Sequence, residues 1–545
     1  MQKVKNTIRF AMAHPREILL YPAILYVTAF VLGLIFFWGD GGFVHIDEMH
    51  WVERAHILIA THGIPAYHWH HTQFYNYFLA ICLYLFGENY FLIHLVQNFF
   101  IASFPVIVYF TLRYCFSEKK VTRPETGDSF QETVRNGSLT IPLFGGFLAA
   151  TSFFSTYITA NFLIENLTFV FFALSLHLWH RYYQEAGTKA DMRNLVCAAL
   201  CTGITFNFKE TSVMLYALPL LYILWQTRKT LTFRKIIVLL FIFGLSVSPF
   251  ILVLFFTDFF FARYYLGSTF PSSMNLVETL YGNFLILTDL NLSYLPFLTV
   301  IAIIGGLYLI IIKFRRRSDK NRASRLDTLA FFSLLSIIGY YIFLIFRPSN
   351  QFLVMLLPPL TILAAWFGMQ IFQFTKSIIA NKESDLDRDR KCTKHFQILF
   401  VIIIGSQVAY TGYAMFVTKP VIYQSYDVWT QISTRVGNNA TYLTIALGDI
   451  YFSNAYGPSM WHASYRRHGW LSYAEEDLRE LNATLFHEWN IKNIVVSDGE
   501  ISNDYVKNLI LSNGTLLGKW SYQFIETQKN PFTPSNYTVY LFYIS

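Results

Sequence analysis

The sequence predicts a mostly α-helical, polytopic membrane bundle followed by a small C-terminal α/β domain. Of its 545 residues, 54% are hydrophobic and only 14% are charged, whereas a soluble protein carries roughly 25% charged residues. Apolar runs recur up to residue 417, and then the composition shifts. Most of the chain is therefore expected to lie in lipid.

The basic charge follows the pattern of a membrane protein and not that of a nucleic-acid-binding protein. The formal net charge is +8. Residues 419–545 hold nine Lys or Arg and eleven Asp or Glu, so the positive excess lies in the first 418 residues, where it clusters in short loops. Short basic loops are typical of the cytoplasmic side of a membrane. We therefore expect no nucleic-acid partner.

Twelve apolar runs are candidate membrane spans, since a bilayer core needs roughly 20 apolar residues per helix. The first is too long for a signal-peptide core, so we expect it to be retained. The twelve runs are 18–38, 73–87, 90–115, 140–158, 162–180, 194–208, 211–227, 235–256, 285–313, 327–346, 350–374 and 397–417.

The basic loops predict the orientation of the chain. Lys3, Lys5, Arg9 and Arg16 precede the first span, which predicts a cytoplasmic N-terminus. Counting back from the later basic loops places the C-terminal domain outside, but twelve spans would place it inside. A break at Ser103-Phe104-Pro105 that divides 88–116 into two short helices would give thirteen. We expect about 12–13 transmembrane helices in the plasma membrane, or in the endoplasmic reticulum if the source is eukaryotic.

The C-terminal residues 418–545 read as an α/β domain on the extracytoplasmic side, next to a membrane domain of residues 1–417. Short strands are expected at Thr441–Leu447 and Asn493–Ser497, and an amphipathic helix at Tyr473–Trp489. Alternating runs predict two further strands at Thr515–Phe524 and Tyr537–Ile544.

The first outer loop, residues 39–72, holds two adjacent carboxylates, Asp47 and Glu48. Acidic residues beside a bilayer are costly unless they are solvated, paired or used. A partly desolvated carboxylate is suited to act as a general base. The alternative is that Asp47 caps a short helix at Met49–Ala60, with Trp51 on its apolar face. That alternative does not explain Glu48.

Histidines in the same loop suggest a divalent metal. His68-x-His70-His71 follows the two acids, and His45 precedes them. Histidine suits zinc, whereas carboxylates suit magnesium or manganese. The spacing matches no standard metal site, and the alternative is a polar, aromatic-rich loop that contacts a sugar.

Charged residues interrupt apolar runs at three further places, and the predicted topology puts these places on the side of Asp47. They are Glu165, the pair Lys209-Glu210, and Arg347. Intramembrane ionisable residues are functional candidates by default. Lys209 and Arg347 stand where a lipid phosphate would meet the interface. The alternative is snorkelling or mutual pairing, for example of Lys209 with Glu165.

This pattern resembles the GT-C superfamily of membrane glycosyltransferases, and most of all the branch of protein O-mannosyltransferases and lipid A aminoarabinose transferases. Four pieces across residues 1–375 carry the resemblance. They are Asp47-Glu48 followed by Glu53-Arg54-Ala55-His56, then His71-Thr72-Gln73-Phe74-Tyr75, then Ile164-Glu165-Asn166 ahead of Phe206-Asn207-Phe208-Lys209-Glu210, and Arg347 ahead of Leu357-Pro358-Pro359-Leu360.

The resemblance implies an enzyme that moves a sugar from a polyprenyl- or dolichyl-phosphate carrier to a hydroxyl of a protein, glycan or lipid. It implies that Asp47 is the catalytic carboxylate, that Glu165 is a second acid in the cavity, and that Lys209 lies near the carrier phosphate. We expect Glu48 to assist Asp47, and Arg347 to help hold the phosphate.

The sequence also departs from the family pattern. Thr72-Gln73 stands where prolines are usual, and Glu165 stands where aspartate is usual. The His-x-Asp-Glu form is also similar to that of endoplasmic-reticulum mannosyltransferases. The rival functions are a transporter or flippase of lipid-linked sugars and a non-catalytic glycolipid-binding protein. A transporter would carry polar residues spread through its spans and a repeat of the bundle, whereas this sequence has its charges concentrated at one face and no repeat.

Overall fold

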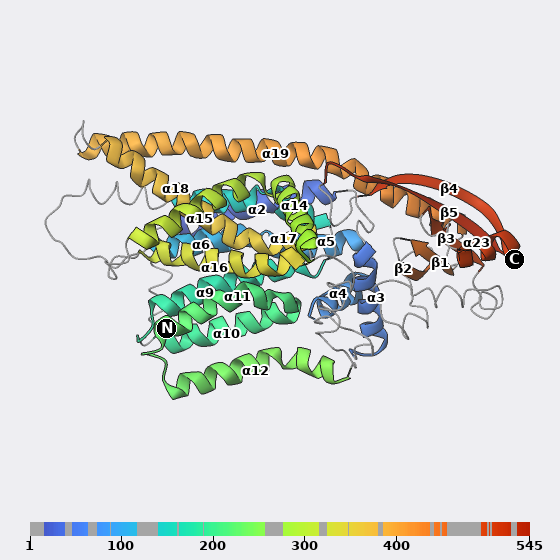
Figure 1. The fold of residues 1–545 in the computed structure, drawn as a ribbon, viewed down its shortest axis with the longest axis horizontal. Coiled ribbons are helices and arrows are strands. Elements are labelled where there is room, and N and C mark those ends of the chain that lie inside the picture. Colours follow the sequence, from blue (N-terminus) through green and yellow to red (C-terminus); the bar gives the residue numbers. More distant parts are fainter. Residues whose placement is uncertain are drawn as a thin grey trace.

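The computed structural model is a helical bundle with a five-stranded sheet beyond one end (Figure 1). The N-terminal part of the bundle comprises η1 (Arg16–Leu20), α2 (Tyr21–Phe37), α3 (Ile46–Ala60), α4 (Phe74–Phe86), α5 (Tyr90–Ile101), α6 (Phe104–Phe116), α8 (Phe153–Tyr157), η2 (Ile158–Ala160), α9 (Glu165–Gln184), α10 (Asp191–Phe208) and η3 (Glu210–Ser212). The later helices are α11 (Val213–Thr227), α12 (Phe233–Phe256), α14 (Leu276–Tyr294), α15 (Pro296–Arg315), α16 (Arg325–Phe346), α17 (Asn350–Leu353), η4 (Val354–Leu356), α18 (Leu357–Ile379) and α19 (Asp385–Val436). The structure describes residues 16–38, 46–63, 74–87, 89–116, 140–160, 163–188, 190–256, 276–315, 324–346, 348–379, 385–436, 441–446, 449–454, 492–498, 501, 504–524 and 531–545.

The chain is a multi-pass membrane protein. Among the described residues, six helices are long and apolar enough to cross a membrane, and a seventh is added if one bent pair counts as a single span. The six are Arg16–Phe37, Tyr90–Phe116, Pro296–Lys313, Arg325–Phe346, Asn350–Thr375 and Lys394–Val421. The bent pair is Thr140–Ala150 with Phe153–Ala160, at 47°. The other expected spans also form helices of the same bundle, and α12 among them has 24 residues.

Two prolines stand at helix starts within the expected spans. The run Tyr90–Phe116 is divided between α5 and α6 next to Ser103-Phe104-Pro105, as predicted, but the two helices form one span, so the break does not supply a thirteenth span. Pro105 lies in the first turn of α6, where a missing N–H costs little. Conversely, the expected single span 285–313 is divided between α14 and α15, and α15 begins at Pro296. Proline disfavours a helical conformation in the residue before it, which here is Leu295.

Aromatic and basic side chains mark the two ends of the bundle. Trp38 follows α2 and is 61% exposed, and its carbonyl accepts a hydrogen bond from Lys419 Nζ at 3.2 Å. We call this the α3 end, because α3 lies beside it (Figure 1). At the opposite end the guanidinium of Arg228 lies 4.2 Å from the ring of Trp225. Trp and basic residues gather at membrane–water interfaces, so these pairs mark the two interfaces.

A polar contact set at the opposite end joins α6, α9 and α10 through Glu185. Its carboxylate accepts hydrogen bonds from the Tyr114 hydroxyl at 2.9 Å and from Asn194 Nδ2 at 2.8 Å. Arg181 lies 3.5 Å away. Burial raises the pKa of Glu185, but these hydrogen bonds and the charge of Arg181 outweigh burial and hold the pKa below its usual value.

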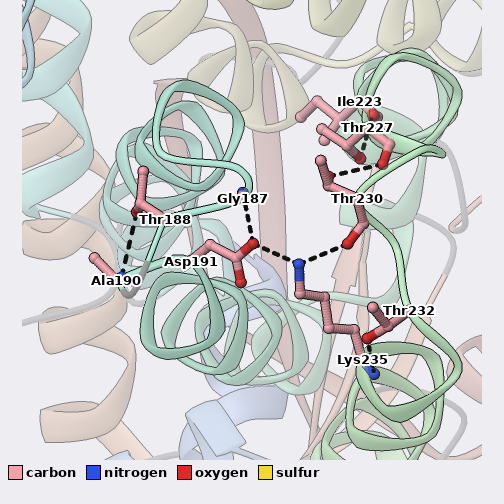
Figure 2. A network of polar contacts seen from close by, with 9 residues as sticks. All are labelled: Gly187, Thr188, Ala190, Asp191, Ile223, Thr227, Thr230, Thr232 and Lys235. Atoms are coloured by element: carbon pink, nitrogen blue, oxygen red, sulfur yellow. Dashed lines mark hydrogen bonds and ion pairs between the residues drawn. The ribbon is translucent and has the colours of Figure 1, made fainter.

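A second contact set ties the start of α10 to α12 (Figure 2). Lys235 Nζ lies 2.5 Å from Asp191 Oδ2 and donates a hydrogen bond to the Thr230 carbonyl at 2.7 Å. Asp191 also accepts the Gly187 amide hydrogen bond at 2.8 Å. Both members of the ion pair are buried. The pair therefore fixes the turn between α9 and α10 against the start of α12.

Helices α10 and α12 also approach closely in the last turns of α10, at Ser246 of α12. A Cβ built on Gly203 would lie 1.8 Å from the Ser246 Cβ, and Asn207 donates a side-chain hydrogen bond to the Ser246 carbonyl. Small residues allow such close helix contacts in membranes. Consequently α10 is held against α12 both at its start, through Asp191, and near its end, through Gly203 and Asn207.

Helix α19 runs along the bundle and continues into the C-terminal domain (Figure 1). At the bend of the broken span, Gln407 Nε2 donates hydrogen bonds to the Leu148 carbonyl at 2.7 Å and to Thr151 Oγ1 at 2.9 Å. These bonds satisfy backbone and side-chain groups that the bend leaves outside the helical ladder. Because α19 is continuous to Val436, the expected domain border at residue 418 falls within a helix.

The C-terminal sheet has the strand order β2-β1-β3-β5-β4. Its strands are β1 (Thr441–Ala446), β2 (Asp449–Asn454), β3 (Asn493–Ser497), β4 (Gly514–Phe524) and β5 (Ser535–Ile544), and α23 spans Asp504–Asn513. The pair β1–β3 is parallel and the others are antiparallel. All four predicted strands are present. The strand β2 and the helix α23 were not predicted. The expected helix at 473–489 falls outside the described residues. The last turns of α19 cover one face through Val428 and Ile432.

Candidate functional site

The acidic pair of the first loop lies in a helix and not in a loop. Helix α3 begins at Ile46, so Asp47 and Glu48 both stand in its first turn, where the helix dipole favours carboxylates. The sequence placed the start three residues later, with Asp47 as a cap. Trp51, Ala55 and Leu58 are buried as predicted. The side chains of the two acids are not among the described ones.

Glu165 and Lys209 form a buried ion pair at the α3 end. Lys209 Nζ lies 3.0 Å from Glu165 Oε1, and the two side chains are 4% and 1% exposed. Glu165 is in the first turn of α9 and Lys209 is the C-cap of α10. A carboxylate at a helix start and an ammonium at a helix end are each stabilised by the helix dipole. The sequence left open whether Lys209 binds a lipid phosphate or pairs with Glu165, and in the structure it pairs with Glu165.

Buried polar and aromatic groups surround this pair. Lys209 Nζ lies 5.1 Å from the ring centroid of Phe352, which lies in the short helix α17. Tyr340 of α16 is fully buried and lies close enough to Glu165 for the two groups to interact electrostatically. Four segments, from α9, α10, α16 and α17, therefore converge on one ion pair.

A single apolar cluster joins α3 to the ion pair. It contains the buried face of α3, residues of α4 and α5, and the immediate neighbours of the pair, Ile164 and Phe208. Phe208 packs edge-on against Phe74 at 5.8 Å and stacks on Phe171 at 5.1 Å. The helix that carries Asp47 is thus packed beside the segments that carry Glu165 and Lys209.

The remaining predicted site residues fall outside the described part of the chain. These are His45, His68, His70, His71 and Arg347. Within the described residues, no three His, Cys, Asp or Glu side chains are grouped so that they could hold a metal ion. The metal predicted for the first loop therefore stays a prediction.

Several polar residues near α3 were missed by the sequence reading. Arg54 is fully buried in α3. Behind it, the Tyr75 hydroxyl donates a hydrogen bond to Gln97 Oε1 at 2.7 Å, and His94 Nδ1 lies 3.1 Å from the Thr159 carbonyl. The signal was present, because His94 and Gln97 recur at helical spacing in an otherwise apolar run.

Comparisons with known proteins agree with this architecture. A family model described as dolichyl-phosphate-mannose-protein mannosyltransferase matches residues 137–254, which include Glu165 and Lys209. No curated protein matches the chain.

Two solved structures of ArnT from Cupriavidus metallidurans resemble the whole chain at 14% identity. The apo structure has a TM-score of 0.54 and covers 97% of this chain and 98% of its own. The structure bound to undecaprenyl phosphate has a TM-score of 0.51 and covers 96% and 97%. The predicted helical membrane bundle with a small C-terminal sheet is confirmed, and its fold is similar to that of ArnT.

Proposed function

We propose that this protein is a membrane glycosyltransferase that moves one sugar from a polyprenyl or dolichyl phosphate to a hydroxyl acceptor. The observation that carries the proposal is the packing of the acidic helix α3 beside the buried Glu165–Lys209 pair, at one end of a bundle with the fold of ArnT. A neighbour of that fold was solved with undecaprenyl phosphate bound. This ligand supports a lipid phosphate as the donor.

The proposed step uses Asp47 as the base. The acceptor oxygen forms a bond to the anomeric carbon while the bond from that carbon to the phosphate oxygen breaks, and the electron pair leaves with the lipid phosphate. The acceptor proton passes to the Asp47 carboxylate, and Glu48 orients the acceptor. Positioned carboxylates contribute about 10²–10⁴-fold to such steps.

Lys209 and Glu165 are proposed to act together. Glu165 shapes the sugar pocket and is paired with Lys209. An ammonium has three N–H donors, so pairing with Glu165 is compatible with a contact from Lys209 to the departing phosphate. Arg347 is the second proposed phosphate ligand, because arginine binds phosphate through two parallel N–H groups.

The acceptor is proposed to arrive on the outer or lumenal face. The C-terminal sheet lies beyond the α3 end of the bundle (Figure 1), so it is suited by position to present a protein, glycan or lipid hydroxyl. The cytoplasmic N-terminus and the extracytoplasmic sheet follow from the basic loops. A mannose-like sugar is favoured by the family match to residues 137–254.

The test is transfer of label from radiolabelled lipid-phosphate sugars to a membrane acceptor pool, with wild type compared with Asp47→Asn. The matched control is Asp504→Asn, which changes an exposed acid in the first turn of α23 in the same isosteric way. We expect wild type and the control to transfer label, and Asp47→Asn at equal membrane level to lose it. Equal transfer by all three would make Asp47 a structural helix residue. No transfer with any donor would favour a transporter or a glycolipid-binding protein.

A further inference from the structure

The short helix α17 lies between the two long helices α16 and α18. It has only four residues, Asn350–Leu353, and a helix of this length is not stable by itself because nucleation is unfavourable. The side chains of Asn350, Phe352 and Leu353 are all buried. The place of α17 in the bundle must therefore come from contacts between these side chains and the neighbouring helices.

Asn350 is anchored by the hydroxyl of Tyr294, the last residue of α14. Asn350 Nδ2 donates a hydrogen bond to the Tyr294 hydroxyl oxygen at 2.9 Å, and both side chains are buried. Three rings of α8 surround the Tyr294 ring, with centroid distances of 6.0 Å to Phe153, 4.9 Å to Phe154 and 5.4 Å to Tyr157. These rings fix the position of the hydroxyl, so the hydrogen bond fixes the first turn of α17.

The ring of Phe352 connects α17 to the buried ion pair. Its centroid lies 5.1 Å from Lys209 Nζ, and it packs against the ring of Phe343 in α16 at 5.5 Å. Lys209 Nζ also lies 3.0 Å from Glu165 Oε1. An ammonium is attracted to the face of an aromatic ring, most strongly where water is excluded. The ring and the carboxylate together restrict the directions in which this flexible side chain can point.

We propose that the hydrogen bond between Tyr294 and Asn350 positions Lys209 to bind the phosphate of the lipid donor. The bond acts through Phe352, because it holds the helix that places this ring against the ammonium. The inference rests on the proposed function and deepens it, because it names two positioning residues that set the affinity for the lipid phosphate. A side chain that is ordered before binding loses less freedom when the ligand arrives. Loss of the hydrogen bond therefore weakens phosphate binding and leaves the chemical step unchanged.

The experiment measures the Kd of the purified protein for undecaprenyl phosphate by native mass spectrometry, and the donor KM and kcat in the transfer assay. Tyr294→Phe keeps the ring and removes only the acceptor oxygen. We expect it to raise the Kd and the donor KM about three- to tenfold while kcat stays within about twofold. Asn350→Leu should have the same effect, and the double variant Tyr294→Phe/Asn350→Leu should have no larger one, because the two residues act through one bond. If Asn350→Leu does not accumulate, Tyr294→Phe alone decides.

The controls separate positioning from a general loss of stability. Tyr109→Phe removes a hydroxyl that donates a hydrogen bond to the Glu17 carbonyl at 2.9 Å, towards the opposite end of the bundle. This control should lower the thermal midpoint and leave the Kd for undecaprenyl phosphate unchanged. Phe352→Leu removes the aromatic face and should raise the Kd about tenfold or more, whereas Phe352→Tyr keeps the face and should recover most of the lost affinity.

Three results would overturn the inference while leaving the proposed function standing. They are an unchanged Kd in Tyr294→Phe, a double variant whose loss of affinity is the product of the single losses, and a Tyr109→Phe variant that loses affinity as much as Tyr294→Phe does. If wild type binds no undecaprenyl phosphate, the proposed donor fails and this inference fails with it.

Discussion

Breaking the Glu165–Lys209 pair should cost both stability and activity. At 3.0 Å and an effective dielectric constant of about 20, opposite unit charges attract by about 5.5 kcal/mol. Both side chains are almost fully buried, so water does not screen them, although their desolvation offsets part of the attraction. Removing one partner leaves the other charge buried, which costs about 3–5 kcal/mol. We therefore expect Lys209→Met to have a clearly lower thermal midpoint in detergent than wild type.

A double variant separates the structural role of the pair from its role in the reaction. Glu165→Gln/Lys209→Met removes both charges, so its thermal midpoint should recover relative to either single variant, while transfer activity stays lost. The matched control is Asp191→Asn/Lys235→Met at the other end of α10, which should recover both stability and activity. Additive losses of stability in the Glu165/Lys209 cycle would refute the energetic coupling. Activity in that double variant would refute the functional role.

Three further predictions concern the frame around the site. Gly203→Leu should lower the thermal midpoint strongly because a side chain at this position collides with Ser246. The control is Gly244→Ala, whose added carbon meets nothing within 4 Å, and it should leave the thermal midpoint unchanged. Gln407→Leu should cost about 1–3 kcal/mol by leaving the bent span without its donor, seen as a lower midpoint at unchanged membrane level. The pKa of Glu185 is lowered in the folded protein. Its contribution to the free energy of unfolding is therefore full above the unfolded pKa of about 4.3 and is lost as the pH falls through the lower folded value. Glu185→Gln should flatten the acid-side pH dependence of the thermal midpoint, and an unchanged slope would contradict this prediction.

The sequence predicted most helices because hydropathy reports burial in lipid directly. It failed where a single residue decides a boundary. Pro296 divides an apolar run that hydropathy reads as continuous, whereas Pro105 lies where a helix tolerates proline. In the C-terminal domain, Asp449–Asn454 mixes polar and apolar residues as a short edge strand, which leaves a weak periodic signal.

The candidate site was predictable in its composition but not in its pairing. Glu165 and Lys209 were identified because charges inside apolar runs are costly, and their pairing was one of two readings. Choosing between these readings needed the packing of α9 against α10. The Asp191–Lys235 pair depends on the packing of α10 against α12, which no local pattern reveals. Arg54 was visible in a motif, but its burial depends on α4 and α5.

The most direct test of sugar transfer follows the donor and the product together in proteoliposomes of purified protein. The account predicts that wild type releases one free lipid phosphate for each sugar that appears on the acceptor, and that Asp47→Asn, inserted at the same level, does neither. Movement of intact lipid-linked sugar across the bilayer without release of lipid phosphate, equal in wild type and Asp47→Asn, would contradict the account.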